Sequence, residues 1–369
     1  MIFQDVLEIK NGRNQKNVED PEGKYPIYGS GGIIGYANAY ICEKDSVIIG
    51  RKGSINNPIF VQEPFWNVDT AFGLQTDKRI LLPRYLYYFC RKFNFEKLNK
   101  AVTIPSLTKA DLLKIEINLP ILSMQQQIVD KLLLIEQIMC NQKKELQYLD
   151  MLIKARFVEM FGDAVLNPMN WPVKKLGDLA IQINSGNTPK GGSENYVDQG
   201  ITFFRSQNVW KDRLEMDDIA YIDTKTHESM KRSSLKHGDI LMTKTGRINT
   251  ENSSLGRAAL YMGEDDKANV NGHVYFIRLK PEVNNKFILR ILVSTEYRDL
   301  IRSVCVGGID KRQLNKEHIE NFPIICPPSN MINEYVTFVE QVNKSKLEVQ
   351  KALDKTQILF DSLMQQYFG

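Results

Sequence analysis

The chain has 369 residues, of which 43% are hydrophobic and 25% charged, and its formal net charge is +4 with a pI near 8.6. This composition is typical of a globular protein with room for two domains, and the mild basicity permits nucleic-acid binding without requiring it. Its longest apolar runs are too short for a membrane span, and we expect no signal peptide at the N-terminus. The five cysteines are odd in number and none is spaced CxxC, so we expect reduced thiols and a cytoplasmic protein rather than disulfides or a zinc site.

Four segments follow one another along the chain. The first head, residues 1–118, contains short β-branched and aromatic runs at 33–50 and 57–76, which predict strands, and an amphipathic run at 84–98, which predicts a helix. A long helical stretch at 119–162 follows. The second head, residues 163–326, repeats the pattern with strands around 258–263 and 273–279 and a helix at 286–304, and a second long helix occupies 327–369. We expect each head to be α+β, built around an irregular twisted sheet.

The chain is internally repeated. Residues 107–162 align without a gap with residues 314–369, and 11 of the 56 pairs are identical. The heads also match in part, because the segment Phe3–Asn14 is similar to Leu176–Thr188 and Asp45–Ile55 is similar to Gly238–Ile248. A repeat of this kind predicts two copies of one structural unit.

The repeated tails have the pattern of long amphipathic helices. In the first tail, apolar residues from Ile128 to Met160 recur at alternating steps of four and three, interrupted at Gln142 and Arg156. Ser123 with Gln126 has the form of a capping box at the start, and Gly162 supplies a stop. Helices of roughly 55 Å cannot bury such stripes alone, so we expect an antiparallel coiled coil with a pseudo-twofold axis. The alternative is that each helix packs only on its own head.

Motifs of catalysis are weak. The segment GSGGIIG (29–35) resembles a phosphate-binding loop, but a turn and a strand follow it where such a loop needs a helix. Asn57-Pro58-Ile59-Phe60 lies close to the Asn-Pro-Pro-Tyr/Phe motif of amino-methyltransferases but lacks the second proline. No Walker A loop or HExxH pair occurs, so we expect no catalytic residue, no metal and no cofactor bound by this chain.

Polar and basic turns stand at matching places in the two heads. Arg51-Lys52-Gly53-Ser54 and Lys244-Thr245-Gly246-Arg247 each follow a predicted strand, where backbone N–H groups and cations suit phosphates and groove edges. These turns suggest DNA binding, and ordinary solvated loops are the alternative. The candidate DNA-binding residues are Arg13, Arg51, Lys52, Ser54, Asn56, Asn57, Lys190, Arg205, Gln207, Asn208, Lys244, Thr245, Arg247, Asn249 and Asn252.

The tails resemble those of type I restriction–modification specificity subunits. LPILSMQQQIVDKL (119–132) is similar to the Leu-Pro-Pro-Leu-x-Glu-Gln-x-x-Ile-Val segment that opens the family's conserved helix, and LDMLIKARFVEMFG (149–162) is similar to its Phe-Gly end. Both segments recur less faithfully in the second tail. Ile121 and Met124 replace the second proline and the glutamate, and Ile332 stands where the second copy would have glutamine.

The resemblance implies two target-recognition domains, each reading half of a split site on double-stranded DNA, with the helix length setting the gap. It also implies two methyltransferase subunits that bring S-adenosylmethionine, and two restriction subunits that use ATP and Mg²⁺ where such subunits are present. Candidate partner-binding residues on the helices are Gln125, Leu133, Leu134, Ile138 and Phe338, for which wider core packing is the alternative. The competing functions are a methyltransferase or nuclease with degenerate motifs, and a coiled-coil adaptor that does not bind DNA.

Overall fold

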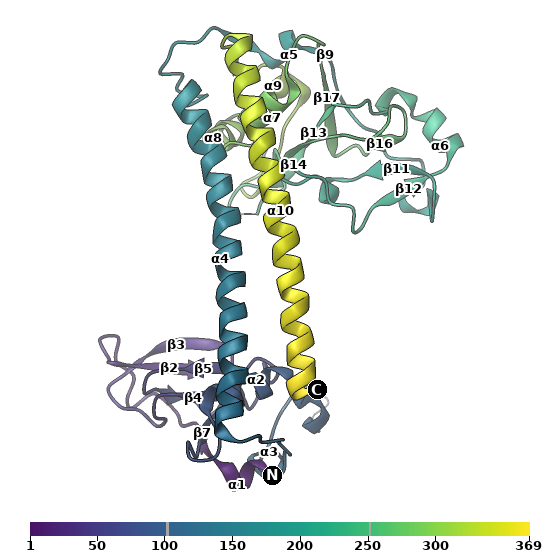
Figure 1. The fold of residues 1–369 in the computed structure, drawn as a ribbon. Helices are drawn as coiled ribbons and strands as arrows, with labels where there is room; N and C mark the ends of the chain where they lie inside the picture. The colour runs from purple at the N-terminus through teal and green to yellow at the C-terminus, as the bar shows by residue number, and fades with distance from the viewer. Residues whose placement is uncertain (101–102, 251) are drawn as a thin grey trace. The chain divides into compact units, whose positions relative to one another are not determined.

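The computed structural model describes residues 1–100, 103–250 and 252–369, and its internal contacts divide it into two compact units. Unit 1 comprises Met1–Gln147 and Lys346–Gly369, and unit 2 comprises Tyr148–Ser345. Two helices of 40 residues, α4 (Leu122–Phe161) and α10 (Ser329–Phe368), each contribute one segment to each unit (Figure 1). The contacts therefore assign the helix halves to the heads, whereas the four-part division of the sequence into heads and spacer helices stays a prediction.

Unit 1 is built on a four-stranded antiparallel sheet in the order β1-β7-β4-β5. A smaller sheet has the order β3-β2-β6, in which β2 and β6 are parallel. The strands are β1 (Leu7–Asn11), β2 (Tyr25–Gly29), β3 (Gly32–Ala37), β4 (Ser46–Gly50), β5 (Ile59–Val61), β6 (Trp66–Asn67) and β7 (Ala71–Thr76). The helices are α1 (Phe3–Val6), α2 (Pro83–Lys92), the 3-10 helix η1 (Phe95–Leu98) and α3 (Lys109–Leu112).

Unit 2 contains a corresponding antiparallel sheet in the order β9-β17-β13-β15. Its strands are β8 (Val173–Lys175), β9 (Ala180–Ser185), β10 (Tyr196–Val197), β11 (Ile201–Phe204), β12 (Ala220–Ile222), β13 (Ile240–Thr243), β14 (Thr245–Arg247), β15 (Ala258–Leu260), β16 (Ala268–Val270), β17 (Val274–Leu279), β18 (Val306–Gly307), β19 (Lys311–Gln313) and β20 (Pro323–Ile325). Its helices are α5 (Leu176–Leu179), η2 (Gly192–Asn195), η3 (Ser206–Asn208), α6 (Thr224–Ser229), η4 (Lys231–Ser233), α7 (Asn285–Leu292), α8 (Thr295–Val304) and α9 (Lys316–Glu320).

The predicted internal repeat is confirmed down to the strand register. Val47 of β4 pairs with Leu74 of β7, and its sequence counterpart Ile240 of β13 pairs with Ile277 of β17. The segment that leads into each tail is tied to the sheet by the same bond, because Leu107 N donates to Arg51 O at 2.9 Å and Leu314 N donates to Lys244 O at 2.8 Å. The two heads are thus one fold used twice.

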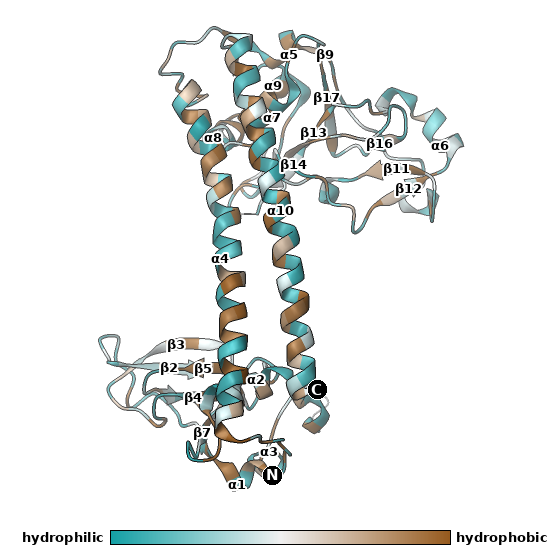
Figure 2. Ribbon diagram, in the orientation of Figure 1, coloured by the Kyte–Doolittle hydropathy of each residue, from teal (hydrophilic) through white to brown (hydrophobic). Residues whose placement is uncertain are grey.

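The long helices pack against each other in both units. In unit 1, Leu132 and Ile135 of α4 share a core with Phe360 and Met364 from the C-terminal half of α10. In unit 2, residues 153–161 of α4 share a core with residues 331–342 from the N-terminal half of α10. The start of one helix therefore meets the end of the other, and the predicted antiparallel pairing is confirmed (Figure 2). Gly162, with φ of +74°, ends α4 as predicted.

Two local predictions were wrong. The helix α4 begins at Leu122, so Ser123 lies inside the first turn and is not the N-cap of a capping box. The predicted helices at 84–98 and 286–304 are each interrupted, at Asn94 and Ser294, whose side chains cap the next turn by accepting from Glu96 N and Tyr297 N. Capping by Asn or Ser competes with helix continuation, and in both places it starts a new helix.

Candidate DNA-binding surfaces

Unit 1 brings Arg13, Arg51 and Lys52 to one end of its sheet. The chain leaves β1 at Arg13, whose N donates to Asn67 O at 2.9 Å, and it leaves β4 at Arg51, whose N donates to Thr70 O at 2.8 Å. All three cationic side chains are exposed. The turn after β1 needs glycine, because a Cβ on Gly12 would lie 1.8 Å from Val68 O. This sheet end thus presents positive charge in a tightly packed turn region, as phosphate contacts require.

The side chains of this turn differ in how they are held. The Arg51 guanidinium donates to Asp69 O at 3.3 Å and lies 5.8 Å from the centre of the Phe72 ring, which holds it near the sheet. Ser54 and Asn57 are exposed. Asn56 serves the fold instead, because its Oδ1 accepts from Phe95 N at 2.7 Å and its Nδ2 donates to Asn94 at 3.3 Å. Asn56 therefore has a structural role, and its predicted contact with DNA stays a prediction.

Unit 2 places Lys244 where unit 1 places Arg51. Lys244 N donates to His273 O at 2.8 Å, which matches the bond from Arg51 to Thr70. The Lys244 ammonium lies 5.8 Å from the Tyr275 ring centre, and the side chain is half-buried. The correspondence extends to backbone and charge, so both heads carry a cation at the same strand end.

The residues after Lys244 form a small polar cavity. Thr245 and Arg247 belong to β14, which pairs with β19, and they line an open cavity of about 530 Å³ together with Asn252 and Lys311. Arg247 is exposed and its Nε lies 3.2 Å from Asp310. Asn249 is also exposed, as is Lys190 in the loop after β9. These groups are available to a polyanion, although nothing in the geometry selects a base.

The group at the end of β11 is partly committed within the protein. Asn208 is buried, and its amide is used by Arg205 N at 3.0 Å, Glu215 O at 3.1 Å and Asp218 O at 3.2 Å. Asn208 therefore has a structural role within unit 2, and its predicted contact with DNA stays a prediction. Arg205 lies 3.1 Å from the Asp218 carboxylate, and Gln207 donates to the same carboxylate at 3.0 Å. These two donors hold the pKa of Asp218 below its ordinary value, so an ionised carboxylate neutralises this corner of unit 2.

Sequence reasoning missed two residues of the same sheet ends. His273 precedes β17 and is exposed. Its carbonyl accepts from Lys244 N, and this bond places it beside the basic turn of unit 2. Ser30 follows β2 in unit 1 and packs beside Gly50 and Gly53 of the basic turn. Only the pairing between strands brings these positions to the turns, and a single sequence carries no signal of it.

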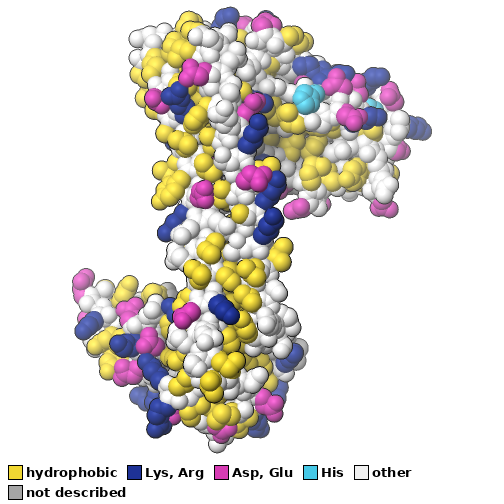
Figure 3. Space-filling view, viewed as in Figure 1, with side chains coloured by type: hydrophobic (Ala, Val, Ile, Leu, Met, Phe, Trp, Pro, Cys, Tyr) yellow, Lys and Arg dark blue, Asp and Glu magenta, His cyan; other side chains and the backbone are white. Residues whose placement is uncertain are grey.

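The partner candidates on the helices divide into exposed and buried residues. Leu134 and Ile138 are 62% and 40% exposed, whereas Leu133 and Phe338 are half-buried, and Phe338 packs near the Arg156 guanidinium. Figure 3 shows hydrophobic side chains over the long helices on the face toward the viewer. Gln125 is fully buried, and its predicted partner contact stays a prediction. Its amide accepts from Leu82 N and donates to Ile80 O and Pro120 O, all at 2.9 Å.

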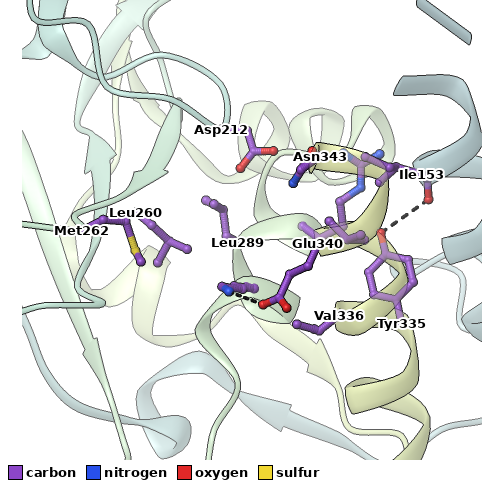
Figure 4. A pocket seen from close by; sticks show the side chains of 12 residues that line it. Ile153, Asp212, Leu260, Met262, Leu289, Tyr335, Val336, Glu340 and Asn343 are labelled. Carbon is purple, nitrogen blue, oxygen red and sulfur yellow. Dashed lines mark hydrogen bonds and ion pairs between the residues drawn. The ribbon is translucent and has the colours of Figure 1, made fainter. Parts of the chain in front are cut away.

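A cavity of about 260 Å³ lies within unit 2 between α7, α10 and the end of β15 (Figure 4). Two of its polar side chains have partners within the lining, because Lys286 contacts Glu340 and Tyr335 Oη donates to the backbone Ile153 O at 3.4 Å. The lining belongs to the packing of helix against head. Among the described residues, no group of three or more His, Cys, Asp or Glu side chains has the geometry to hold a metal ion. All five cysteines are free.

Within residues 1–100, 103–250 and 252–369, none of the helices is long and apolar enough to cross a membrane. A family model described as the type I restriction modification DNA specificity domain matches residues 3–148 and 168–358. The chain belongs to this family. The match covers one copy in each half, in agreement with the structural repeat.

Relatives and solved structures agree with this membership. The chain is 24% identical over 335 residues to a putative type I restriction enzyme specificity subunit of Haemophilus influenzae, covering 86% of this chain and 80% of the relative. It is 23% identical over 341 residues to the MjaIX specificity subunit of Methanocaldococcus jannaschii, covering 86% and 73%. The fold is similar to the crystal structure of a type I restriction–modification S subunit from M. genitalium, with a TM-score of 0.60, 16% identity and coverage of 100% and 95%. A structure from a study of type I complex assembly and conformational transition gives the same TM-score at 15% identity, with coverage of 100% and 96%. None of these findings supports the enzyme or adaptor alternatives.

Proposed function

We propose that this chain is the non-catalytic specificity subunit of a type I restriction–modification system and acts on DNA in the cytoplasm. Each head reads one half of a split site on double-stranded DNA. The single observation that carries the proposal is that two heads of one family place a cation, Arg51 or Lys244, at the same strand end in the same backbone setting. Two heads that share a fold but differ in sequence suit a DNA site whose two halves differ in sequence.

The partners follow from the division of labour in such a system. Two methyltransferase subunits bring S-adenosylmethionine, and restriction subunits, where the system has them, bring ATP and Mg²⁺. The exposed Leu134 and Ile138 on α4 are the candidates for contact with a partner subunit, because apolar side chains at those positions gain from being covered. Phosphate contacts shared with the partners fit the small net charge of +4.

The test is to co-express the full chain with its methyltransferase subunit and to map methylated adenines by single-molecule sequencing. We expect a split motif with a fixed gap that is absent without this chain. Arg51→Ala with Lys52→Ala should weaken methylation through one half-site, and Lys244→Ala with Arg247→Ala through the other. Loss of phosphate contacts weakens binding to all sequences at that half and releases fewer counterions, so the defect should be largest at low salt and shrink as salt rises.

Matched controls lie at the opposite end of each sheet, after the antiparallel strand that neighbours the one before the tested turn. Arg79 follows β7 and Lys280 follows β17, and both side chains are exposed. Arg79→Ala and Lys280→Ala each remove one cation away from the proposed surface and should leave methylation unchanged, whereas Arg51→Ala and Lys244→Ala, which each remove one cation on that surface, should lower it. An unchanged methylation pattern without this chain would contradict the specificity role, and equal losses from control and test variants would contradict the surface.

A further inference from the structure

The glycine-rich segment at 29–35 forms the tip of the β2–β3 hairpin in unit 1. Gly29 pairs with Gly32, so Ser30 and Gly31 make the turn, and a strand rather than a helix follows. Ile33 and Ile34 come next and are 52% and 55% exposed. Two adjacent, largely exposed isoleucines at a projecting turn contribute little to the core, and Figure 2 shows the hydrophobic colouring along β3.

The backbone of the tip is shaped to keep this pair exposed. The register shifts between Ile27, which faces Gly35, and Tyr28, which faces Ile33, so Ile34 is the extra residue of a β-bulge. A bulge redirects a side chain and strengthens the local twist. Gly32 has φ of +131°, which favours glycine, whereas a Cβ on Gly31 would meet nothing within 4 Å. Packing within the protein therefore does not require a glycine at Gly31, and the absence of a side chain there leaves the backbone of the turn open to a molecule that binds it.

The hairpin tip adjoins the basic turn of the same unit. A Cβ on Gly50 would lie 3.1 Å from Ser30 Cβ, and one on Gly53 would lie 4.0 Å from Ser30 Oγ. Arg51 and Lys52 stand between these glycines with exposed side chains. An exposed apolar tip beside two cations fits a partner with negative charge and apolar contact points, which is a description of a DNA groove.

The equivalent place in unit 2 is chemically different. Strand β2 pairs in parallel with β6, and its counterpart β11 pairs in parallel with β16. After β2 come Ser30, Gly31 and the isoleucines, whereas Arg205 and Gln207 follow β11. One head therefore presents bare backbone and apolar side chains where the other presents hydrogen-bond donors.

We propose that the β2–β3 tip enters the major groove and that Ile33 and Ile34 contact the C5-methyl groups of thymine in the half-site read by unit 1. The inference rests on the proposed function and names the recognition chemistry of one head. The major groove admits a two-stranded ribbon, thymine is the base that offers a methyl group there, and glycines permit close approach of the backbone. Unit 1 thus reads at least one thymine by apolar contact, at the position where unit 2 uses polar side chains.

The experiment uses the complex of the full chain with its methyltransferase and duplexes that contain the split motif found by methylation mapping. The half-site of unit 1 is the one affected by Arg51→Ala with Lys52→Ala. Each thymine of that half is replaced by deoxyuridine, which lacks only the methyl group. We expect at least one replacement to weaken binding about fourfold, the worth of one buried methyl group. Ile33→Ser with Ile34→Ser should weaken binding to the thymine duplex about tenfold or more, the loss expected for two apolar contacts.

The decisive result is the combination. In the serine double variant the deoxyuridine duplex should bind as well as the thymine duplex, because the methyl group has lost its partner. Ile33→Val with Ile34→Val should restore most of the sensitivity, and Ile181→Ser, at an exposed position on β9 of unit 2, should change nothing. Both isoleucines are exposed, so unaltered thermal unfolding should accompany the loss.

Three results would overturn the inference while leaving the proposed function intact. They are a unit 1 half-site without thymine on either strand, a serine double variant that keeps its deoxyuridine sensitivity, and a double variant whose only defect is loss of the methyltransferase. If the unaltered complex recognises no split motif, the proposed function itself fails.

Discussion

Gln125 offers a direct test of whether the start of α4 serves the fold or a partner. Its buried amide makes three hydrogen bonds of 2.9 Å, to Leu82 N, Ile80 O and Pro120 O. The first of these satisfies the backbone N–H at the N-cap of α2, and the others tie the strand-to-helix connection to the first turn of α4. Replacing Gln125 by leucine keeps the approximate size of the side chain and removes all three bonds.

The magnitude follows from the groups left without partners. An unsatisfied buried N–H costs about 2 kcal/mol, and each carbonyl about 1 kcal/mol because a second lone pair eases its loss. The leucine side chain returns about 1–2 kcal/mol through apolar burial. We therefore expect Gln125→Leu to lower the free energy of unfolding of unit 1 by about 2–3 kcal/mol. Gln126→Leu is the matched control, because Gln126 is exposed and its amide donates to the exposed Asp130 one helical turn away.

The assay is hydrogen exchange by mass spectrometry on the full-length chain at increasing urea, which reports unit 1 peptides separately from those of unit 2. Peptides covering residues 80–92 should lose protection in Gln125→Leu and keep it in Gln126→Leu. If the two variants agree within about 0.5 kcal/mol, the usual scatter for surface changes, the reasoning is refuted. A stable Gln125→Leu chain that fails only to bind a methyltransferase would restore the partner interpretation.

Three further predictions follow from single contacts. Gly12→Ala should destabilise unit 1 by about 3 kcal/mol or more, because its Cβ would lie 1.8 Å from Val68 O, whereas Gly31→Ala should change the stability by less than about 1 kcal/mol. Urea unfolding compares the two variants, and equal losses of stability would contradict the clash. Cys42 should resist a thiol reagent at pH 8 while the exposed Cys140 reacts. Burial raises the pKa of Cys42 to about 12, so about one Cys42 side chain in 10,000 is a thiolate at that pH. Equal labelling rates for the two cysteines would disprove this prediction. Asp218→Asn should strengthen DNA binding at low salt and steepen its salt dependence by about one released counterion. Arg205 loses its neutralising carboxylate in this variant, while the backbone carbonyl of residue 218 still holds the guanidinium in place. An unchanged salt slope would show that Arg205 does not contact phosphate.

The fold could be predicted from the sequence because its signals are periodic and duplicated. The alternating steps of four and three from Ile128 to Met160 specify the helix stripe, and Gly162 marks its end. The offset between the tails shows that the same unit occurs twice. Element boundaries were less certain, since Asn94 and Ser294 interrupt runs whose apolar spacing alone favours one continuous helix.

The candidate site could be predicted only in outline. Arg51 and Lys244 were recognisable because they follow matching strands, and the structure gives them matching backbone bonds. Asn208, Asn56 and Gln125 have side chains that suit recognition equally well, yet each satisfies backbone groups inside its own unit. Whether an amide faces solvent or a buried N–H depends on which segments fold beside it, and residue type carries no such information.

The two heads show which parts of a recognition domain are fixed by folding and which are free to vary. The sheet register, the strand-end glycines Gly12 and Gly186, and the bond that ties each tail to its turn recur in both, and each meets a backbone constraint that tolerates few substitutions. The segments after β2 and β11 share no such constraint, because one is a glycine turn with exposed isoleucines and the other a short helix with Arg205 and Gln207. Apart from Gly32 and the buried Asn208, side chains in these segments can therefore change with little effect on the sheet beneath them. Differences in DNA preference between the heads should arise there, and exchanging residues within these tips should alter recognition at one half-site while leaving the stability of the head nearly unchanged.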